Sequence, residues 1–310
     1  MITEAVPPAL GGERLDRVVA LVADISRSEA ADVVAAGGVT VDGQAATSGK
    51  VRLTEGQVVE VDIALVPTVE PPAADPGVEF GVVHVDADVI VVDKPAGLVV
   101  HPGAGNPTGT LANGLLARFP DLADVGDPMR PGIVHRLDAG SSGLLVVART
   151  GGAVERLVDQ FVDHSAGRRY VALVWGHPGA PHGVIDAPIG RDRRDPLKMA
   201  VVADGRDART EYEVVERFHR PNELSLLTCA LETGRTHQIR VHLTSIGHPL
   251  VGDTTYGGRR PVLGLQRPFL HAAELTFVHP TSGETLTFTS DLPTDLSDLL
   301  ATLEPVPSAD

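Results

Sequence analysis

A turn followed at once by an unbroken apolar run constrains the fold of this 310-residue chain most strongly. Residues 140–143 read Gly-Ser-Ser-Gly, a turn-forming composition, and residues 144–148 have the length and composition of a buried strand. Asp138 lies just before this turn. The pattern therefore places an aspartate on a loop that enters the core of a sheet, where a rigid strand would support its carboxylate. The alternative is an Asx turn, in which Asp138 only caps its own backbone.

The composition bounds the class of protein. Hydrophobic residues make up 43% of the chain, and no apolar run approaches the roughly 18 residues that cross a bilayer. The first residues carry Glu4 and no basic side chain, unlike a signal peptide. The single cysteine, Cys229, lies in an apolar run, which indicates a buried thiol in a reducing compartment. We therefore expect a cytoplasmic protein that does not contact a membrane.

The charge is acidic as a whole but unevenly distributed. The formal net charge is −15, from 26 basic and 41 acidic side chains, which taken alone argues against a polyanionic partner. The bases nevertheless gather in short clusters that are rich in arginine, such as Arg168 with Arg169 and Arg235 with Arg240. Because arginine suits forked recognition of phosphate, a basic face on an acidic body is compatible with the sequence.

A proline-rich stretch divides the chain into two predicted domains. Residues 13–63 contain two helical segments followed by short strands, too little material for a stable enzyme core. Residues 64–77 are rich in proline and lack hydrophobic periodicity, as expected of a semi-rigid linker. Residues 78–300, in which apolar strands and short helices follow one another, form the second predicted domain.

Several other side chains are candidates for a site. Lys94 and His101 follow predicted strands on backbone broken by Pro95 and a glycine, where a solvated charge and a packed histidine are the alternatives. Tyr170 lies in the predicted strand 168–176, where it can equally be a core aromatic. Arg235 lies where a strand gives way to a helix, and helix N-termini with arginines make anion sites.

A metal site is not expected. His237, His242 and His248 lie close together in the sequence, but no cysteine is near them. Their spacing also lacks the glutamate of the His-Glu-x-x-His motif. Glycine-rich phosphate-binding motifs of the Rossmann and Walker types are absent as well.

Taken together, five segments in order resemble the RluA/RluD-type pseudouridine synthases. The segments are 135–138 (His-Arg-Leu-Asp) with 142–146, 169–174 around Tyr170, 233–240 (Thr-Gly-Arg-Thr-His-Gln-Ile-Arg), 247–253 with 256–257, and 269–272 (Phe-Leu-His-Ala). The likeness covers nearly all of residues 80–295. Residues 13–63 are in turn similar to the S4-type RNA-binding domain, through the motifs at 14–16, 26–28 and 38–43.

This resemblance implies an α+β fold, in which the small domain precedes a catalytic domain built on a mixed, mainly antiparallel sheet flanked by helices. It implies that uridine in structured RNA is detached from its anomeric carbon, turned and rejoined through carbon five, with no cofactor and no metal. Asp138 would be the catalytic carboxylate, since an oxocarbenium-like sugar centre needs an anionic partner. Tyr170 would stack on the base, and Arg235 would pair with Asp138 and keep it ionised.

The resemblance also implies substrate contacts and a partner. The base must leave its stack to reach such a pocket, and Arg136 would fill or hold the vacated space. The remaining expected contacts are His135, Arg169 and Lys94 for the substrate, and Arg14, Arg17 and Arg27 for RNA on the small domain. Large-subunit ribosomal RNA is favoured as the partner over transfer RNA, because the appended small domain is typical of such members. We expect the protein to act as a monomer.

Two other classes of function remain open at this point. One is a non-catalytic RNA-binding or ribosome-assembly protein, which would have no need of Asp138, Tyr170 and Arg235 together. The other is a glycoside hydrolase that uses Asp138 with a second carboxylate. No second carboxylate lies in an equally sharp motif.

Overall fold

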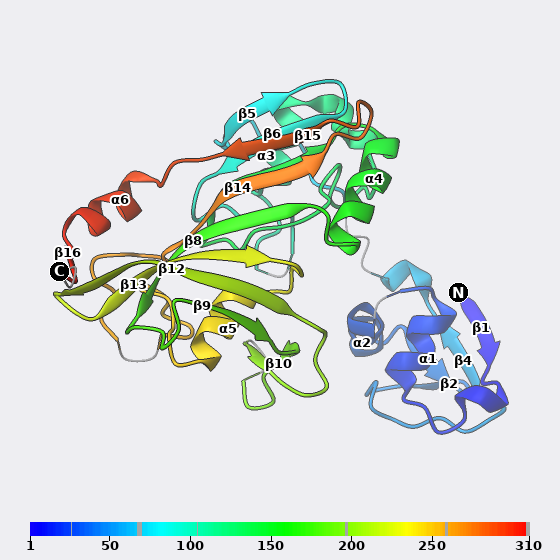
Figure 1. The fold of residues 1–310 in the computed structure, drawn as a ribbon. Coiled ribbons are helices and arrows are strands. Elements are labelled where there is room, and N and C mark those ends of the chain that lie inside the picture. Colours follow the sequence, from blue (N-terminus) through cyan, green and yellow to red (C-terminus); the bar gives the residue numbers. More distant parts are fainter. Residues whose placement is uncertain (26, 67–69, 104, 196–197, 258–259, 308–310) are drawn as a thin grey trace. The chain divides into compact units, whose positions relative to one another are not determined.

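The computed structural model describes residues 1–25, 27–66, 70–103, 105–195, 198–257 and 260–307 (Figure 1). The chain forms two compact units, Met1–Glu70 and Pro71–Asp310. Part of the predicted linker, residues 67–69, lies outside the described residues. From Pro71 on the chain belongs to the large unit, in which the Asp75 backbone N–H donates to the Asn113 carbonyl at 2.9 Å. None of the described helices is long and apolar enough to cross a bilayer.

The small unit packs two helices on a four-stranded antiparallel sheet. Its elements are β1 (Ile2–Ala5), η1 (Pro8–Leu10), α1 (Leu15–Val22), α2 (Arg27–Ala35), β2 (Val39–Val41), β3 (Gln44–Ala45), β4 (Val58–Val61) and η2 (Ile63–Leu65). Apolar side chains at helical spacing on α1, such as Leu15, Val18 and Val19, are buried against the sheet. The sheet order is β1-β4-β2-β3, so β1 extends this unit to residues before the predicted start at 13.

The large unit carries the remaining elements. In chain order they are β5 (Gly81–Val85), β6 (Val89–Lys94), α3 (Leu111–Arg118), η3 (Pro120–Asp124), β7 (Ser142–Ala148), α4 (Gly151–Val162), β8 (Gly167–Trp175), β9 (His182–Asp186), β10 (Ile189–Arg191), β11 (Met199–Val201), β12 (Arg209–Arg220), β13 (Leu224–Leu231), α5 (Gln238–Ser245), β14 (Leu270–Val278), β15 (Thr285–Thr289), α6 (Thr294–Ala301) and β16 (Glu304–Pro305).

One 10-stranded sheet has the order β16-β12-β13-β8-β14-β7-β6-β5, with β9 on β12 and β15 on β14 (Figure 1). The strands β10 and β11 form a separate two-stranded sheet. Among the strand pairs of the described residues, only β7 with β14 is parallel. The predicted α+β fold with a mixed, mainly antiparallel sheet is therefore confirmed.

A glycine makes the parallel pair possible. Gly143 has φ +111°, and a Cβ atom at this position would lie 2.3 Å from the Ala272 carbonyl oxygen. Any side chain would push the two strands apart at this point. Gly143 therefore lets β7 lie against β14 directly after the loop that holds Asp138.

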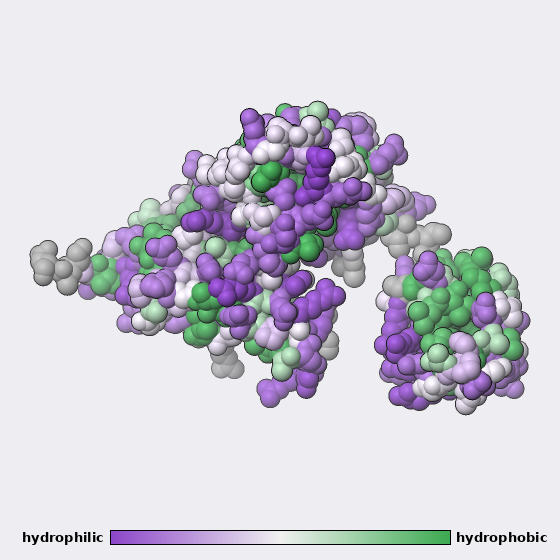
Figure 2. All heavy atoms as spheres, turned by 45° about the vertical axis from the view of Figure 1, so that its right-hand side comes forward, coloured by the Kyte–Doolittle hydropathy of each residue, from purple (hydrophilic) through white to green (hydrophobic). Residues whose placement is uncertain are grey.

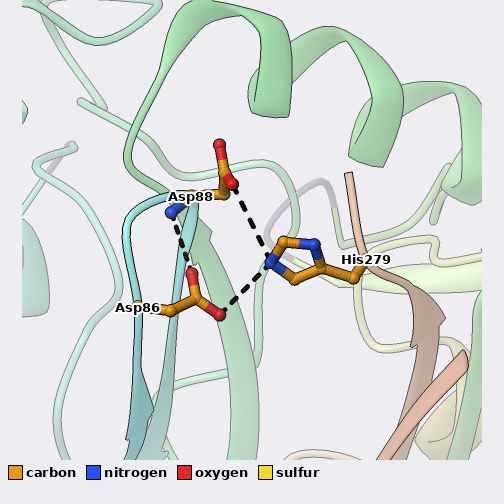
Figure 3. A group of neighbouring side chains, drawn as sticks. All are labelled: Asp86, Asp88 and His279. Carbon is orange, nitrogen blue, oxygen red and sulfur yellow. Dashed lines mark hydrogen bonds and ion pairs between the residues drawn. The ribbon is translucent and has the colours of Figure 1, made fainter. Parts of the chain in front are cut away.

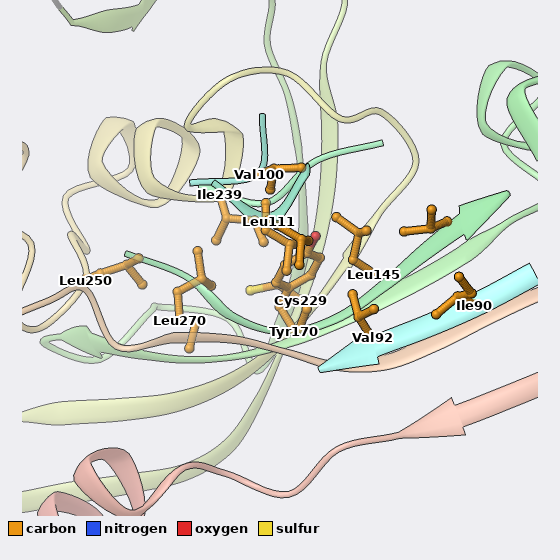
Figure 4. Packing of buried hydrophobic residues seen from close by; sticks show 14 of the residues in the cluster. Ile90, Val92, Val100, Leu111, Leu145, Tyr170, Cys229, Ile239, Leu250 and Leu270 are labelled. Carbon is orange, nitrogen blue, oxygen red and sulfur yellow. The ribbon is translucent and has the colours of Figure 1, made fainter. Parts of the chain in front are cut away.

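Aliphatic side chains fill the space behind this loop. Ile90 and Val92 of β6 and Leu145 of β7 gather there with Leu111 of α3 (Figure 4). The run 144–148 is buried throughout, as its composition predicts. Cys229 lies in the same cluster and is free, and burial raises the pKa of its thiol to about 12.

The surfaces of the two units differ. In the view of Figure 2, hydrophilic residues dominate the large unit, whereas the small unit shows a broad apolar area. Exposed apolar side chains of the small unit include Leu21, Val51 and Ile63. Apolar side chains do not bind RNA phosphates. Any contact of this unit with the RNA backbone therefore depends on its few basic side chains.

Candidate active site

Asp138 lies on a loop that is held at both ends. The Asp138 carbonyl accepts a hydrogen bond from the Ser141 N–H at 3.0 Å, which closes the turn before β7. The next carbonyl, that of Ala139, accepts from the Gly97 N–H at 2.7 Å and from Lys94 Nζ at 3.3 Å. The Asp138 side chain itself is 17% exposed. The predicted placement, an aspartate on a loop fixed by a buried strand, is confirmed.

Lys94 holds this loop from inside and does not face a substrate. It ends β6, its side chain is fully buried, and its ammonium also donates to the carbonyls of Pro95 and Leu98 at 2.8 and 2.9 Å. Burial lowers the pKa of Lys94 to about 7, while the nearby Asp138 charge works in the opposite direction. The prediction of Lys94 as a substrate contact on irregular backbone is therefore wrong, because its three N–H groups donate to the carbonyls of Pro95, Leu98 and Ala139.

The cation that meets Asp138 is Arg240. Nη1 of Arg240 lies 3.6 Å from Oδ2 of Asp138. The same guanidinium donates to both carboxylate oxygens of Asp253, at 2.8 and 3.0 Å, and Asp253 is only 1% exposed. A bidentate pair of this kind fixes the plane of the guanidinium. Asp253 therefore orients Arg240, and Arg240 presents its remaining nitrogen to Asp138.

Arg235 does not make the predicted ion pair. Its Nε donates to the Asp207 carbonyl at 2.9 Å, and it lines the rim of the pocket. The reason lies in the start of α5, which begins at Gln238, with His237 in the left-handed conformation. Arg235 thus precedes the helix on a separate turn, while Arg240, within the helix, is buried and faces Asp138.

Tyr170 lines the pocket beside Asp138, as predicted. It is 6% exposed, and its ring packs in the apolar cluster that contains Leu270 and Cys229 (Figure 4). Burial raises the pKa of Tyr170 to about 12, although the Arg168 charge opposes this shift. The hydroxyl therefore keeps its proton at neutral pH and can donate a hydrogen bond, whereas a phenolate base is disfavoured.

The pocket above Asp138 is small in this conformation. Its free volume is about 40 Å³. An engineered protein cavity that holds benzene, a ring about as large as uracil, has roughly 150 Å³. Arg136, which is exposed, and Arg235 lie on its rim. A nucleobase can enter this pocket only if rim side chains such as Arg136 and Arg235 move aside.

The sequence that builds this site matches a known family. The family model described as RNA pseudouridylate synthase matches residues 88–245, about half of the chain. The chain belongs to this family. An S4 domain model matches residues 13–59, within the small unit.

Relatives extend the match over nearly the whole synthase. An uncharacterized RNA pseudouridine synthase of Chloroflexus aurantiacus is 49% identical over 300 residues, which cover 96% of this chain and 92% of the relative. The ribosomal large subunit pseudouridine synthase D of Xanthomonas campestris is 44% identical over 311 residues, 96% of this chain and 91% of that protein. The solved structure of human RNA pseudouridylate synthase domain containing 1 is similar with a TM-score of 0.59 and 28% identity, over 76% of this chain and 93% of that one.

The two arginines at the start of β8 have opposite environments. Arg169 is exposed, and its Nε lies 3.4 Å from Oε1 of Glu274, so its predicted contact with the substrate stays a prediction. Arg168 is 8% exposed and lines the pocket with Tyr170. Side chains alternate along a strand, so residues 168 and 170 share a face and residue 169 points away. That alternation was visible in the sequence of the synthase.

His135 lies next to the Asp138 pocket rather than in it. Its Nε2 accepts a hydrogen bond from the Val146 N–H at 3.0 Å, and its ring packs 4.4 Å from the Phe161 ring between centroids. Together with Arg136 it lines a second, adjoining pocket. The structure thus places His135 at the neighbouring pocket, and its contact with the substrate stays a prediction.

The three histidines near α5 of the synthase do not converge on a metal. Nδ1 of His237 bonds the Tyr256 hydroxyl, and His242 lies between the Thr210 hydroxyl and a backbone carbonyl. His248 likewise bonds a backbone carbonyl. In the part of the chain that the structure describes, these histidines belong to no group of possible metal ligands.

A different group of possible ligands lies between two hairpin turns (Figure 3). Nε2 of His279 is 3.2 Å from Oδ2 of Asp86 and 3.9 Å from Oδ2 of Asp88. However, Nδ1 of His279 accepts the N–H groups of Thr281 and Ser282, at 3.2 and 3.0 Å. The proton of a neutral ring is then assigned to Nε2, which leaves no lone pair there for a metal. The group fits a hydrogen-bonded link between the β5–β6 and β14–β15 turns.

The arginines of the small unit are paired with acids. Arg14 and Arg27 both contact the buried carboxylate of Asp16, at 3.2 and 3.1 Å from their Nε atoms. Arg17 donates to Glu13 at 2.9 Å. Their role in RNA binding stays a prediction, but each of them already has a counter-ion.

Arg240, Asp253 and Arg168 are the site residues that the sequence reasoning missed. Arg240 and Asp253 each lie within a segment that carries the resemblance. Strand alternation could have identified Arg168, but the signal for Arg240 and Asp253 is burial of a charge, since charged side chains are rarely buried unless paired. That signal comes only from the folded chain.

Proposed function

We propose that this pseudouridine synthase acts on uridine in large-subunit ribosomal RNA, with Asp138 as the catalytic carboxylate and Arg240 as its ionic partner. The carrying observation is the position of Asp138: a carboxylate with access to a pocket, 3.6 Å from a guanidinium that Asp253 orients. The RNA class is supported by the names of relatives such as the ribosomal large subunit synthase D of Xanthomonas campestris and by the S4 domain.

The reaction moves one glycosidic bond. The bond between C1′ and N1 of uridine breaks, the base turns, a bond between C1′ and C5 forms, and C5 loses a proton while N1 takes one up, directly or through solvent. Positive charge develops at the sugar as the first bond breaks, and a fixed carboxylate beside it stabilises that charge. In this chain the carboxylate is Asp138.

Arg240 keeps Asp138 ready for this role. A carboxylate in a partly buried pocket tends to take up a proton, whereas a nearby guanidinium favours the ionised form. Because Asp253 holds Arg240 by two hydrogen bonds, the guanidinium stays beside Asp138 while the base turns. Tyr170, protonated at neutral pH, supplies a flat apolar wall with one hydroxyl donor.

Entry of the uridine requires an opening step. The free volume of about 40 Å³ is too small for a base, so the side chains on its rim must move when RNA binds. Arg136 directly precedes the Leu137–Asp138 pair and is exposed, which suits it to occupy the gap that the flipped base leaves in the RNA.

The test is to incubate the protein separately with large-subunit ribosomal RNA and with transfer RNA, and then to map new pseudouridines. We expect new pseudouridine at defined positions of the ribosomal RNA and none with the Asp138→Asn variant. Modification confined to transfer RNA would contradict the proposed substrate. Unchanged modification by Asp138→Asn would contradict the proposed catalytic residue.

A further inference from the structure

Buried nitrogens without partners gather around one space. Among the described residues, five buried side-chain nitrogens lack a hydrogen-bond partner. Three of them, His101 Nδ1, His135 Nδ1 and Arg168 Nε, belong to residues that line the same pocket, which we call the side pocket. Buried polar atoms are nearly always paired. Three unpaired nitrogens therefore lie in the wall of one pocket, just beneath its surface, where a ligand reaches them only if the wall shifts.

The side pocket is large and has an apolar wall. Its free volume is about 300 Å³, which is within the range of small-ligand pockets. Ile133, Val158 and Phe161 form the apolar part of its lining. Arg136 and Arg235 line both this pocket and the Asp138 pocket. The side pocket thus adjoins the catalytic carboxylate and, unlike the space above Asp138, already has room for a base.

The unpaired nitrogens of His135 and Arg168 are donors. Nε2 of His135 accepts from the Val146 N–H, so the proton of the neutral ring is assigned to Nδ1. Burial, with a further contribution from the Arg168 charge, lowers the pKa of His135 to about 3, so the ring is neutral at physiological pH. Nε of Arg168 also carries a hydrogen, while its Nη2 is used by the Glu232 carbonyl at 2.9 Å. A ligand that reaches either atom must therefore offer hydrogen-bond acceptors.

The pocket also has excess positive charge. Of its arginines, Arg130 is paired with Asp127. For Arg136, Arg168 and Arg235, the described part of the chain contains no carboxylate within ion-pair distance. Guanidinium groups without counter-ions next to an RNA-modifying site suit a phosphate.

We propose that the side pocket binds a nucleotide adjacent to the target uridine in the same RNA strand. This proposal rests on the proposed function. The base lies against Ile133 and Val158, and a small shift of the pocket wall lets its acceptors reach Nδ1 of His135 and Nε of Arg168. Its phosphate lies on Arg136 and Arg235, at the border with the Asp138 pocket. Inorganic phosphate alone would leave the apolar wall unused, and unstacked bases are the usual target of sequence-specific RNA recognition.

One pair of variants isolates the pocket. Val158→Glu places a carboxylate on the pocket wall, where it repels phosphate and offers the arginines a competing partner. Val278→Glu makes the same change on β14, at a side chain that lines none of the pockets described here. The two valines are 37% and 38% exposed, so both variants should fold. Thermal denaturation checks that they do.

The first probe is a large-subunit ribosomal RNA transcript, on which the modified uridine is mapped. The second probe is a synthetic stem-loop that contains this uridine. We expect Val158→Glu to raise KM about ten-fold with kcat within about two-fold, and Val278→Glu to change neither by more than about two-fold. Single abasic residues are then placed at each flanking position of the stem-loop. One of them should raise KM of the wild type about ten-fold and add little in Val158→Glu, because both changes remove the same contact.

Three outcomes would overturn the proposal. One is equal behaviour of the two glutamate variants. Another is that the abasic effects are the same in wild type and in Val158→Glu. The third is that no flanking base matters, in which case the space is at most a passage for the target uridine. If the wild type forms no pseudouridine, the proposed function fails; the affinities of both variants for the ribosomal transcript then test the pocket by themselves.

Discussion

The arginines of the small unit and those around the side pocket have opposite environments. In the small unit, Arg14 and Arg27 share Asp16, and Arg17 is paired with Glu13. Around the side pocket, Arg136 and Arg168 make no ion pair with a carboxylate of the described chain. The first set stabilises its own fold. The second set is available to a ligand.

This difference shows why a count of arginines is a poor guide to RNA binding. Residues 1–70 contain five basic side chains (Arg14, Arg17, Arg27, Lys50 and Arg52) and eleven acidic ones. Affinity for RNA depends on phosphates that are neutralised, each of which releases counter-ions. A basic side chain that already has an acidic partner contributes less to counter-ion release. We therefore expect most of the electrostatic affinity to come from the large unit.

The largest effect should come from Asp138→Asn, which separates chemistry from binding in the large unit. The amide keeps the shape of the side chain but removes the anion, so turnover should fall by at least about a thousand-fold. RNA affinity, measured by filter binding, should change by less than about three-fold. A comparable loss of affinity would mean that Asp138 organises the RNA site and that the charge is not used in chemistry.

The next effect separates two arginines of the same pocket. Arg240→Lys cannot reproduce the two hydrogen bonds to the buried Asp253, so we expect kcat to fall about a hundred-fold and the melting temperature to drop. Arg235→Lys, the matched control, should mainly raise KM, since Arg235 bonds a backbone carbonyl on the rim. If Arg235→Lys lowers kcat as strongly as Arg240→Lys, the assignment of Arg240 as the partner of Asp138 is wrong.

A smaller effect tests the comparison of the two regions directly. Arg136→Gln should reduce the slope of log affinity against log salt by about one unit, because it removes an unpaired cation at the pocket. Arg17→Gln should change the slope much less, because Arg17 is paired with Glu13. Fluorescence anisotropy with a ribosomal RNA transcript over a salt series measures both. Equal changes would show that the pairing of Arg17 gives way to RNA.

The smallest effect concerns pH and stability. The folded-state pKa of His135 is lowered to about 3 by burial, against 6.5 for the free side chain. Its neutral ring therefore contributes stability that is fully present above pH 6.5 and is lost as pH falls toward 3, because the unfolded chain takes up a proton first. Urea denaturation at pH 7 and pH 4.5 should show a smaller difference for His135→Gln than for the wild type. Identical differences would indicate that His135 is protonated in the folded protein.

The sequence predicted the parts of the site that depend on local pattern. The turn at 140–143 and the apolar run after it placed Asp138 correctly, and strand alternation placed Tyr170 in the core. The partner of Asp138 could not be predicted in this way. Both Arg235 and Arg240 lie in one motif, and the choice between them depends on where α5 begins, at Gln238.

Lys94 shows a second limit of sequence pattern. A lysine next to a proline and a glycine is typical of an exposed loop, yet this side chain is fully buried. Its burial is tolerated because three carbonyls, from Pro95, Leu98 and Ala139, converge on one ammonium. Ala139 lies 45 residues along the chain from Lys94, so such convergence arises only in the folded protein.

The parallel pairing of β7 with β14 connects the two halves of the sheet that line the site. Asp138 belongs to the half of the sheet that contains β5, β6 and β7, whereas Tyr170 belongs to the half that contains β8, β13 and β14. Two residue pairs, His271 with Ser142 and Ala272 with Gly143, set the register of this pairing. The position of Asp138 relative to Tyr170 therefore depends on how closely β7 approaches β14, and Gly143 is the residue that permits this close approach.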